Sequence, residues 1–413
     1  MAKQLQPVKG TRDLYGAEGR AHRHVVDTAD AVSRSYGYDR METPMFEQVE
    51  VFNRPLGESS DVVTKEMFDF QTKGGDHVVL RPENTAGVVR SVISNGLTHD
   101  LPGRYFYAGP MFRYERPQAG RYRQFTQIGV ELIGPEQPTA DVDVIACGWQ
   151  ILSDLGLTDH VTVHLNTLGD TESRNAYRSE LVAYFNDHRA KLSEDSLARL
   201  EKNPLRILDS KDEGDRALLP DAPKFVDHLN AVSQDHYATV KAGLDNLDLP
   251  YKHDDNLVRG FDYYCHTAFE FITEQLGAQG TVLGGGRYDG LSKLLGGPQM
   301  AGVGWAAGVD RLAMLLGEAP AAPAPVAFVP LGEEAENVAQ KLVFELRANG
   351  VQVDMNYSGN MKKRLTRANK VGAKQTVILG EDELKAGIAL VRDMEGGEQR
   401  EVPLSSLVEE MSA

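Results

Sequence analysis

Cysteine is nearly absent from this chain, which has only Cys147 and Cys265 among its 413 residues. Two widely separated cysteines cannot form a framework of several disulfides. They also lack the clustered spacing of a structural zinc site, and the scattered histidines do not supply it. The sequence therefore predicts no metal site built from its side chains. It favours the reducing cytoplasm as the compartment.

Long hydrophobic runs are also missing. No stretch approaches the roughly 20 apolar residues that span a bilayer. The N-terminus lacks the basic region and apolar core of a secretory signal, so we expect no membrane partner. Hydrophobic residues make up 41% of the chain and charged residues 25%, as in soluble globular proteins. A chain of this length predicts two or three domains.

Positive charge is in deficit, since the formal net charge is -16. A negative total argues against a nucleic-acid partner, but the distribution of charge matters more than its sum. Residues 361–374 contain six lysines and arginines and no acid, and residues 113–123 contain four arginines and one acid. Charge alone leaves two alternatives open for each stretch, an RNA contact or a solvated face.

Three prolines among alanines at 317–325 indicate a semi-rigid linker. We place a first domain at 1–318, the linker at 319–325 and a second domain at 326–413. In the second domain, predicted strands alternate with helices, which indicates a small α/β domain with a largely parallel sheet. The strands are predicted at 326–330, 351–355 and 375–379, and the helices at 335–349 and in a basic segment ending at 371.

The first domain is predicted to be α+β, with an antiparallel sheet flanked by helices. A long helix is expected at 19–36. A polar loop joins two strands into a hairpin, and from about 170 to 256 charged helical patterns indicate a helical insertion. The strands are predicted at 106–113, 123–133, 269–272, 281–284 and 301–305.

Residues 259–264 read Arg-Gly-Phe-Asp-Tyr-Tyr. Glycine is avoided inside a strand unless a ligand or another backbone approaches closely. Arginine offers a planar donor fork that suits carboxylate and phosphate, and a buried tyrosine needs a polar partner that a substrate can supply. The stretch predicts a site for an anionic reacting group and a small polar side chain.

Three glycines at 284–286 have two interpretations. They form a flexible turn, or a strand stripped of side chains so that a substrate can lie against it. The Arg-Tyr-Asp-Gly that follows favours the floor of a pocket. No Gly-Lys-Ser/Thr follows, so this is not a phosphate-binding P-loop.

These motifs resemble those of one family. Residues 257–264 resemble the signature peptide of histidyl-tRNA synthetases, and 284–290 are similar to the family's second signature. Residues 112–115 and 302–311 resemble the general class II synthetase motifs, and 9–13 resemble the family's N-terminus. The resemblance implies a class II catalytic domain, a C-terminal anticodon-binding domain and a homodimer whose interface is formed largely by the first motif.

The resemblance also implies the reaction of a histidine–tRNA ligase, with histidine, ATP, Mg²⁺ and tRNA-His as partners. Histidine and ATP react to give histidyl-adenylate and pyrophosphate. The histidyl group is then transferred to the 3' end of the tRNA. Arg113 and Arg259 would hold the α-phosphate, with Arg113 also at the substrate carboxylate, and Arg311 would hold the γ-phosphate. Lysine would lose the fork geometry of each. Singly, each arginine also has an ordinary surface interpretation.

The resemblance assigns further residues to the substrates. Glu131 and Tyr264 would contact the imidazole, with Tyr263 and Tyr288 nearby, and Glu83, Thr85 and Gln127 would hold the ammonium group. A pocket that pairs both ring nitrogens rejects other amino acids, because its own polar groups would be left unpaired. Glu131 has a second interpretation as a surface carboxylate on a strand, and Asn84 stands where glycine is common in the family.

The loop at 115–123 and the basic helix would meet ATP and the tRNA. Glu115 and Arg121 would lie near ATP. Arg116 and Gln118 would reach the first base pair, and the helix would face the anticodon stem through Lys362, Lys363 and Arg367. We expect His266 to lie beyond the pocket as a structural residue. The leaving phosphate or the substrate would then take the proton in the transfer step.

Two rival functions remain. A regulatory paralogue of the family serves ATP phosphoribosyltransferase and would keep the fold while losing the anticodon domain and the ATP arginines. A class II synthetase for proline, threonine or glycine would lack the two signatures that this chain carries.

Overall fold

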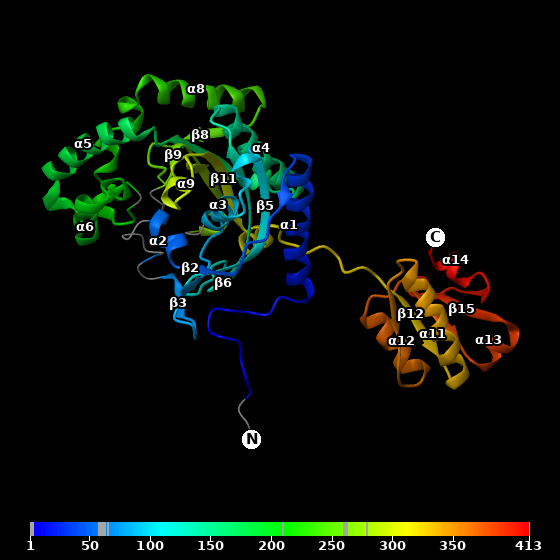
Figure 1. Cartoon of the computed structure of the whole chain (residues 1–413). Coiled ribbons are helices and arrows are strands. Elements are labelled where there is room, and N and C mark those ends of the chain that lie inside the picture. Colours follow the sequence, from blue (N-terminus) through cyan, green and yellow to red (C-terminus); the bar gives the residue numbers. More distant parts are fainter. Residues whose placement is uncertain are drawn as a thin grey trace. The chain divides into compact units, whose positions relative to one another are not determined.

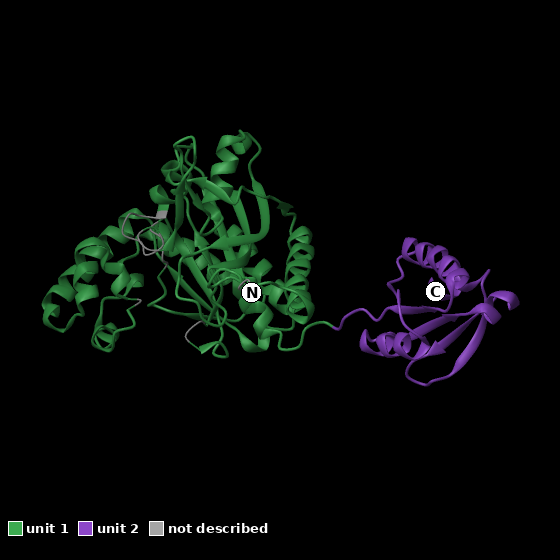
Figure 2. Cartoon of the chain, turned by 90° about the horizontal axis from the view of Figure 1, so that it is seen from below, with its two compact units in different colours: residues 1–320 green, residues 321–413 purple. Residues whose placement is uncertain are grey.

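The computed structural model describes residues 4–56, 63, 66–208, 210–258, 263–277 and 280–412. The chain forms two compact units, Met1–Pro320 and Ala321–Ala413 (Figure 2). The division falls within the proline-rich stretch 317–325. Among the described residues, no helix combines the length and the apolar character that crossing a bilayer requires.

The first unit is built on an eight-stranded, mostly antiparallel sheet (Figure 1). Only the outermost pairs, β1 with β5 and β7 with β8, are parallel. The predicted antiparallel hairpin is confirmed, since β5 pairs with β6 along its whole length. In spatial order the strands are β1 (Asp39–Arg40), β5 (Gly103–Phe112), β6 (Gln124–Gly134), β11 (Ala301–Gly308), β10 (Thr281–Arg287), β9 (Cys265–Ile272), β7 (Thr162–Thr167) and β8 (Tyr251–His253).

Successive side chains of each strand point to opposite faces of this sheet, as the pleat of a strand requires. In β6, Ile128, Val130 and Leu132 join the main hydrophobic core. The intervening residues, among them Gln127 and Glu131, therefore face the opposite side. The main core packs the sheet against α1 (Gly16–Ser35), α4 (Pro138–Asp154), α8 (Ala231–Asn246) and α10 (Val309–Leu315).

A second core covers the opposite face. It includes residues of α2 (Glu50–Leu56), α3 (Thr85–Ser94) and α9 (Leu291–Leu294) together with Tyr107, Tyr263, Tyr264 and Tyr288. A small antiparallel sheet stands beside these helices, in the order β2 (Phe46–Gln48), β4 (His77–Leu80) and β3 (Phe68–Gln71). The tyrosines of both family signatures thus meet on one face of the large sheet.

The segment predicted as a helical insertion, about 170–256, divides between two cores. Its first part has a core of its own, built from α5 (Thr171–Asp187), α6 (Glu194–Lys202) and short turns up to Leu229. Figure 1 shows α5 and α6 together, away from α1. Its second part belongs to the large sheet, because α8 packs into the main core and β8 pairs with β7.

The second unit has a five-stranded sheet in the order β13, β12, β14, β15, β16. The three strands predicted here form a parallel set, and β15 and β16 extend it in the antiparallel sense. Its elements are β12 (Val326–Pro330), α11 (Glu333–Ala348), β13 (Val353–Met355), α12 (Met361–Lys370), β14 (Gln375–Leu379), α13 (Glu381–Ala386), β15 (Ile388–Asp393), β16 (Gln399–Pro403) and α14 (Leu407–Ser412).

Candidate active site

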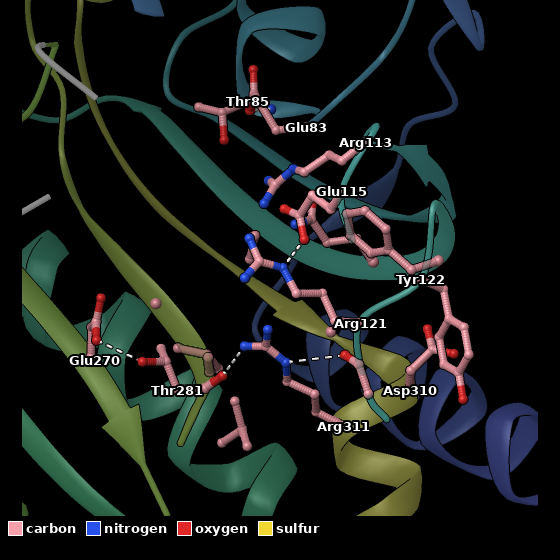
Figure 3. A pocket seen from close by; sticks show the side chains of 18 of the residues that line it. Glu83, Thr85, Arg113, Glu115, Arg121, Tyr122, Glu270, Thr281, Asp310 and Arg311 are labelled. Carbon is pink, nitrogen blue, oxygen red and sulfur yellow. Dashed lines mark hydrogen bonds and ion pairs between the residues drawn. The ribbon is translucent and has the colours of Figure 1, made fainter. Parts of the chain in front are cut away.

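A pocket of about 300 Å³ opens beside β6, β10 and β11 of the large sheet. The loop between β5 and β6 forms part of its wall. Most of the residues that the sequence predicted for histidine and ATP line it, namely Glu83, Thr85, Arg113, Glu115, Arg121, Gln127, Tyr263, Tyr264 and Arg311. In Figure 3, Glu83 and Thr85 lie at one end and Arg311 at the other, with Arg113 and Arg121 between them.

The carboxylate end of the pocket is organised around Thr85, the first residue of α3. The Glu83 carboxylate accepts hydrogen bonds from the backbone N–H groups of Thr85 at 2.6 Å and Ala86 at 3.1 Å. An anion is favoured at a helix N-terminus, where backbone donors have no partner within the helix. Glu83 is nevertheless buried, and burial raises its pKa.

Glu131 lies beneath Thr85 and is fully buried. Its carboxylate accepts hydrogen bonds from the hydroxyl groups of Thr85 at 2.6 Å and Tyr288 at 2.5 Å. Burial raises the pKa of Glu131 to about 8, although both hydrogen bonds oppose that rise. The alternative that Glu131 is a surface carboxylate is therefore wrong.

Two glycines of β11 leave space for the side chains of Glu131 and Tyr288. A Cβ on Gly304 would overlap the Glu131 carboxylate, and a Cβ on Gly302 would overlap the Tyr288 ring. The glycines at 284–286 lie in β10, so the turn interpretation is wrong for them. Gly284 lines the pocket, as the floor interpretation predicts.

Tyrosines and a glutamine surround the same end. Tyr263 and Tyr264 are both buried, with ring centroids 4.6 Å apart, and the Tyr263 ring meets Tyr288 edge-on at 6.1 Å. Gln127 is also buried, and its Oε1 has no hydrogen-bond partner among the described residues. A buried acceptor without a partner is costly, so this atom suits a donor supplied by a ligand.

Positive charge extends from the middle of the pocket, at Arg113, to its opposite end, at Arg311. Arg113 donates to the carbonyl oxygen of Pro82 at 2.9 Å, and its guanidinium lies 5.3 Å from the centre of the Phe125 ring. Arg311 donates to the carbonyl oxygen of Thr281 at 2.5 Å and to that of Gly120 at 3.4 Å. Burial lowers the pKa of Arg311, and the charges of Arg113 and Arg121 lower it further. Like charges held together in this way favour an anion between them.

Three carboxylates accompany these arginines. Glu115 forms an ion pair with Arg121 across the loop, and the more distant Glu66 lies 3.8 Å from the same guanidinium. On β9, Glu270 accepts a hydrogen bond from the Thr281 hydroxyl at 2.8 Å. Among the described residues, no group of three or more histidine, cysteine or acidic side chains could hold a metal ion alone.

A supporting network behind Arg311 was not predicted. Arg12 donates to Asp310 at 2.7 Å and lies 4.2 Å from the centre of the Tyr122 ring. Asp310 also accepts from the backbone N–H of Thr126 at 3.1 Å. Both Tyr122 and Asp310 line the pocket. The signals in the sequence were the resemblance of residues 9–13 to the family's N-terminus and of residues 302–311 to a class II motif.

The other predicted residues are not among those that line the pocket, including the buried pair Glu131 and Tyr288. Arg116 and Gln118 are exposed on the loop between β5 and β6, and Lys362, Lys363 and Arg367 are exposed on α12. His266 stacks on His236, with ring centroids 4.5 Å apart, and does not line the pocket. Arg259 falls outside the described residues.

Comparison with known proteins agrees with this geometry. The family model described as histidyl-tRNA synthetase matches residues 10–312, and the model described as anticodon binding domain matches residues 325–413. A histidine–tRNA ligase of Rhodospirillum rubrum is 55% identical over 406 residues, which cover 98% of each chain.

Solved structures share the fold over the whole length. The crystal structure of apo histidyl-tRNA synthetase from S. aureus has a TM-score of 0.84 and 35% identity, and it covers 99% of this chain and 100% of that one. A Bacillus halodurans chain described as an ATP phosphoribosyltransferase regulatory subunit/histidyl-tRNA synthetase has a TM-score of 0.67. It covers 92% of this chain and 99% of that one at 21% identity, which shows a shared fold alone.

Proposed function

The chain belongs to the histidyl-tRNA synthetase family, and from that premise we propose how its pocket activates histidine. The chain is a histidine–tRNA ligase that uses ATP. The observation that supports the mechanism best is the polarity of the pocket, with Glu83 and Thr85 at one end, Arg311 at the other and Arg113 between them. The buried Glu131 accepts a hydrogen bond from Thr85 at the first end. An amino acid and a triphosphate need such opposite surroundings.

In the first step, a carboxylate oxygen of histidine attacks the α-phosphorus of ATP. A new oxygen–phosphorus bond forms, the bond to the oxygen bridging the α- and β-phosphates breaks, and pyrophosphate leaves. We assign Arg113 to the substrate carboxylate and the α-phosphate, and Arg311 to the γ-phosphate. The backbone carbonyls that hold both guanidinium groups fix them before the substrates arrive, so charge can be stabilised without reorganisation. Arg259 joins this assignment from its motif alone.

Selection of histidine rests on the opposite end of the pocket. We assign Glu83, Thr85 and Gln127 to the ammonium group, since Gln127 offers an acceptor without a partner among the described residues. Glu131, with Tyr264 and Tyr288, is assigned to the imidazole. An amino acid without ring nitrogens could not exchange hydrogen bonds with these polar groups, and discrimination of this kind reaches several orders of magnitude.

In the second step, a terminal ribose hydroxyl of the tRNA attacks the histidyl carbonyl carbon, and AMP leaves. No histidine is found among the described residues that line the pocket, so the phosphate of the departing AMP is assigned to accept the proton. Arg116 and Gln118 are assigned to the acceptor end of tRNA-His. Lys362, Lys363 and Arg367 are assigned to its anticodon stem.

Mg²⁺ is proposed to enter with ATP rather than through a protein cage. Magnesium in nucleotide sites commonly uses one or two carboxylates and the substrate phosphates. Glu270, which lines the arginine end of the pocket beside Thr281, supplies a suitable carboxylate. Bound there, the ion would neutralise charge on the phosphates.

We also propose a homodimer in the cytoplasm, where tRNA is charged. The small sheet exposes large apolar side chains, with Phe46 on β2 57% exposed, Phe70 on β3 46% exposed and the adjacent Met45 52% exposed. Exposed apolar side chains that cluster mark protein interfaces. Light scattering on the purified chain measures the mass, and a monomer at micromolar concentration would exclude this interface.

The test of the function is exchange of labelled pyrophosphate into ATP without tRNA. We expect exchange with histidine and none with proline, threonine or glycine, and a loss of orders of magnitude in Arg259→Ala. Absence of exchange from a folded chain that still binds histidine would instead support the regulatory role. Exchange with another amino acid would keep the adenylation chemistry and overturn the assignments of Glu131 and Tyr264.

A further inference from the structure

Helix α5 of the insertion contacts, through Arg174, the backbone of a tyrosine that lines the pocket. Arg174, in the first turn of α5, donates a hydrogen bond from its guanidinium to the backbone carbonyl of Tyr264. Tyr264 lines the pocket, whereas Arg174 does not. The insertion therefore contacts the substrate site indirectly, by holding the backbone from which a pocket tyrosine extends.

Backbone hydrogen bonds join the residues that precede α5 to the residues that follow Tyr264. The N–H of His266 donates to the carbonyl of Gly169 at 2.8 Å, and the N–H of Leu168 donates to the carbonyl of His266 at 2.6 Å. These bonds extend the pairing of β7 with β9 by one step. Gly169 has a φ of 54°, and a Cβ there would lie 2.7 Å from the Cβ of Ser173. Only glycine fits this turn without a shift.

The direction of α5 is fixed as well. The carboxylate of Asp170 accepts from the N–H of Ser173 at 2.8 Å and from the side chain of Asn230 at 2.8 Å. Ser173 and Ser233 also contact each other through their hydroxyl groups at 3.3 Å, joining the first turns of α5 and α8. Arg174 follows this joint by one residue, so its position relative to the sheet is set by several independent contacts.

We propose that Arg174 is a positioning residue through which the insertion sets the histidine affinity of the pocket. This inference rests on the proposed function, because it takes Tyr264 as a contact of the substrate ring. A guanidinium is permanently charged and its donors are rigidly arranged, so it holds the Tyr264 carbonyl in one place more firmly than a neutral donor does. The phenol ring of Tyr264 then stays where an imidazole can meet it.

The test separates histidine from ATP in pyrophosphate exchange. In Arg174→Met, we expect the KM for histidine to rise on the order of tenfold, since a hydrogen bond from a charged donor is lost. The KM for ATP should stay within about twofold, because the arginine end of the pocket has separate supports. Arg174→Lys keeps a charged donor and should recover part of the affinity. Arg178→Met is the matched control, since Arg178 lies one turn further along α5 and is exposed, and it should change neither KM.

Three outcomes would overturn the proposal. The KM for histidine in Arg174→Met could equal that of the wild type, both KM values could rise together with a fall in Tm, or Arg174→Lys could lose as much histidine affinity as Arg174→Met. If Arg174→Met does not fold, the comparison of Arg174→Lys with the wild type decides, with a selective rise in the KM for histidine expected. Absence of exchange by the wild type would contradict the proposed function itself and is thereby distinguished from failure of this inference.

Discussion

Two regions of this chain carry clustered positive charge, and they use it differently. In the pocket, Arg113 and Arg311 are held by backbone carbonyls, and burial lowers the pKa of both. On α12 of the second unit, Lys362 and Lys363 are exposed. Anion binding in the pocket therefore depends on the geometry of the arginines. Anion binding by the helix depends on charge, which salt screens.

Helix α12 also contains one arginine that, like those of the pocket, is held by backbone carbonyls. Arg364 is 5% exposed and donates to the carbonyls of Pro330 and Gly359, the latter at 2.8 Å, and to Glu336 at 2.9 Å. It fixes the loop before α12 to the end of β12. The contrast is thus between buried and exposed cations rather than between two domains, and substitutions can test it.

The largest effect is expected for Arg113→Lys. Lysine keeps the charge but loses the planar fork, so a pocket that depends on geometry should lose about 10²- to 10³-fold in the rate of pyrophosphate exchange. Arg104→Lys is the control, because Arg104 lies on the adjoining strand β5 and pairs at 2.7 Å with Asp143. It should leave the rate unchanged. An Arg113→Lys variant with nearly normal exchange would show that charge alone suffices in the pocket.

Arg364→Met should give the next largest effect, on stability rather than chemistry. Several buried oxygens lose their donor, which costs about 3 kcal/mol in the free energy of unfolding. Calorimetry of the full chain should show a lower Tm for one transition, while pyrophosphate exchange without tRNA stays normal. Arg367→Met, three residues further on, removes an exposed pair with Asp354 and should change the Tm little. Equal Tm values for the two variants would remove the distinction between buried and exposed arginines.

Local patterns in the sequence predicted the elements that carry this contrast. The sequence predicted β5 and β6 as two strands joined by a polar loop, and the motif after the glycines at 284–286 favoured a pocket floor, which Gly284 of β10 lines. The sequence left Glu131 with two interpretations, a contact of the imidazole or a surface carboxylate, and its burial could not be predicted. Burial depends on α3, whose Thr85 covers it.

Contacts between distant segments could not be predicted from local patterns. Arg12 meets Asp310 across 298 residues, and neither residue has a neighbour in sequence that indicates the pair. The edge strand β8 and helix α8 read as part of a helical insertion, yet both belong to the large sheet and its core. Their hydrophobic residues could pack in the core of the insertion or in that of the large sheet, and local patterns do not distinguish the two.

Glu131 extends the comparison to a buried acid. Because burial raises its pKa to about 8, the native state binds a proton that the unfolded chain has released above about pH 4.5. The wild type should therefore lose stability relative to Glu131→Gln as pH rises from 5 to 8, by at most about 1.4 kcal/mol per pH unit.

Thermal unfolding of both proteins across this pH range measures the difference. Below pH 4.5 the difference should become constant, since the carboxyl is then protonated in both states. A Tm difference that is constant throughout would show that Glu131 is ionised in the folded chain. The exposed Glu381 on α13, which pairs with Lys385, provides the control substitution Glu381→Gln.

The smallest effect is expected for Lys362→Gln and Lys363→Gln. Exposed cations bind phosphate through charge and counterion release, so each loss should weaken tRNA-His binding a few-fold and reduce the slope of log K against log salt by about 0.7 to 0.9. Lys385→Gln on α13 of the same unit is the control, because Lys385 already pairs with Glu381 at 2.7 Å. A filter-binding titration at several salt concentrations measures both quantities. Unchanged slopes in both variants would mean that α12 is only a solvated face, and that the exposed half of the comparison has no role in binding RNA.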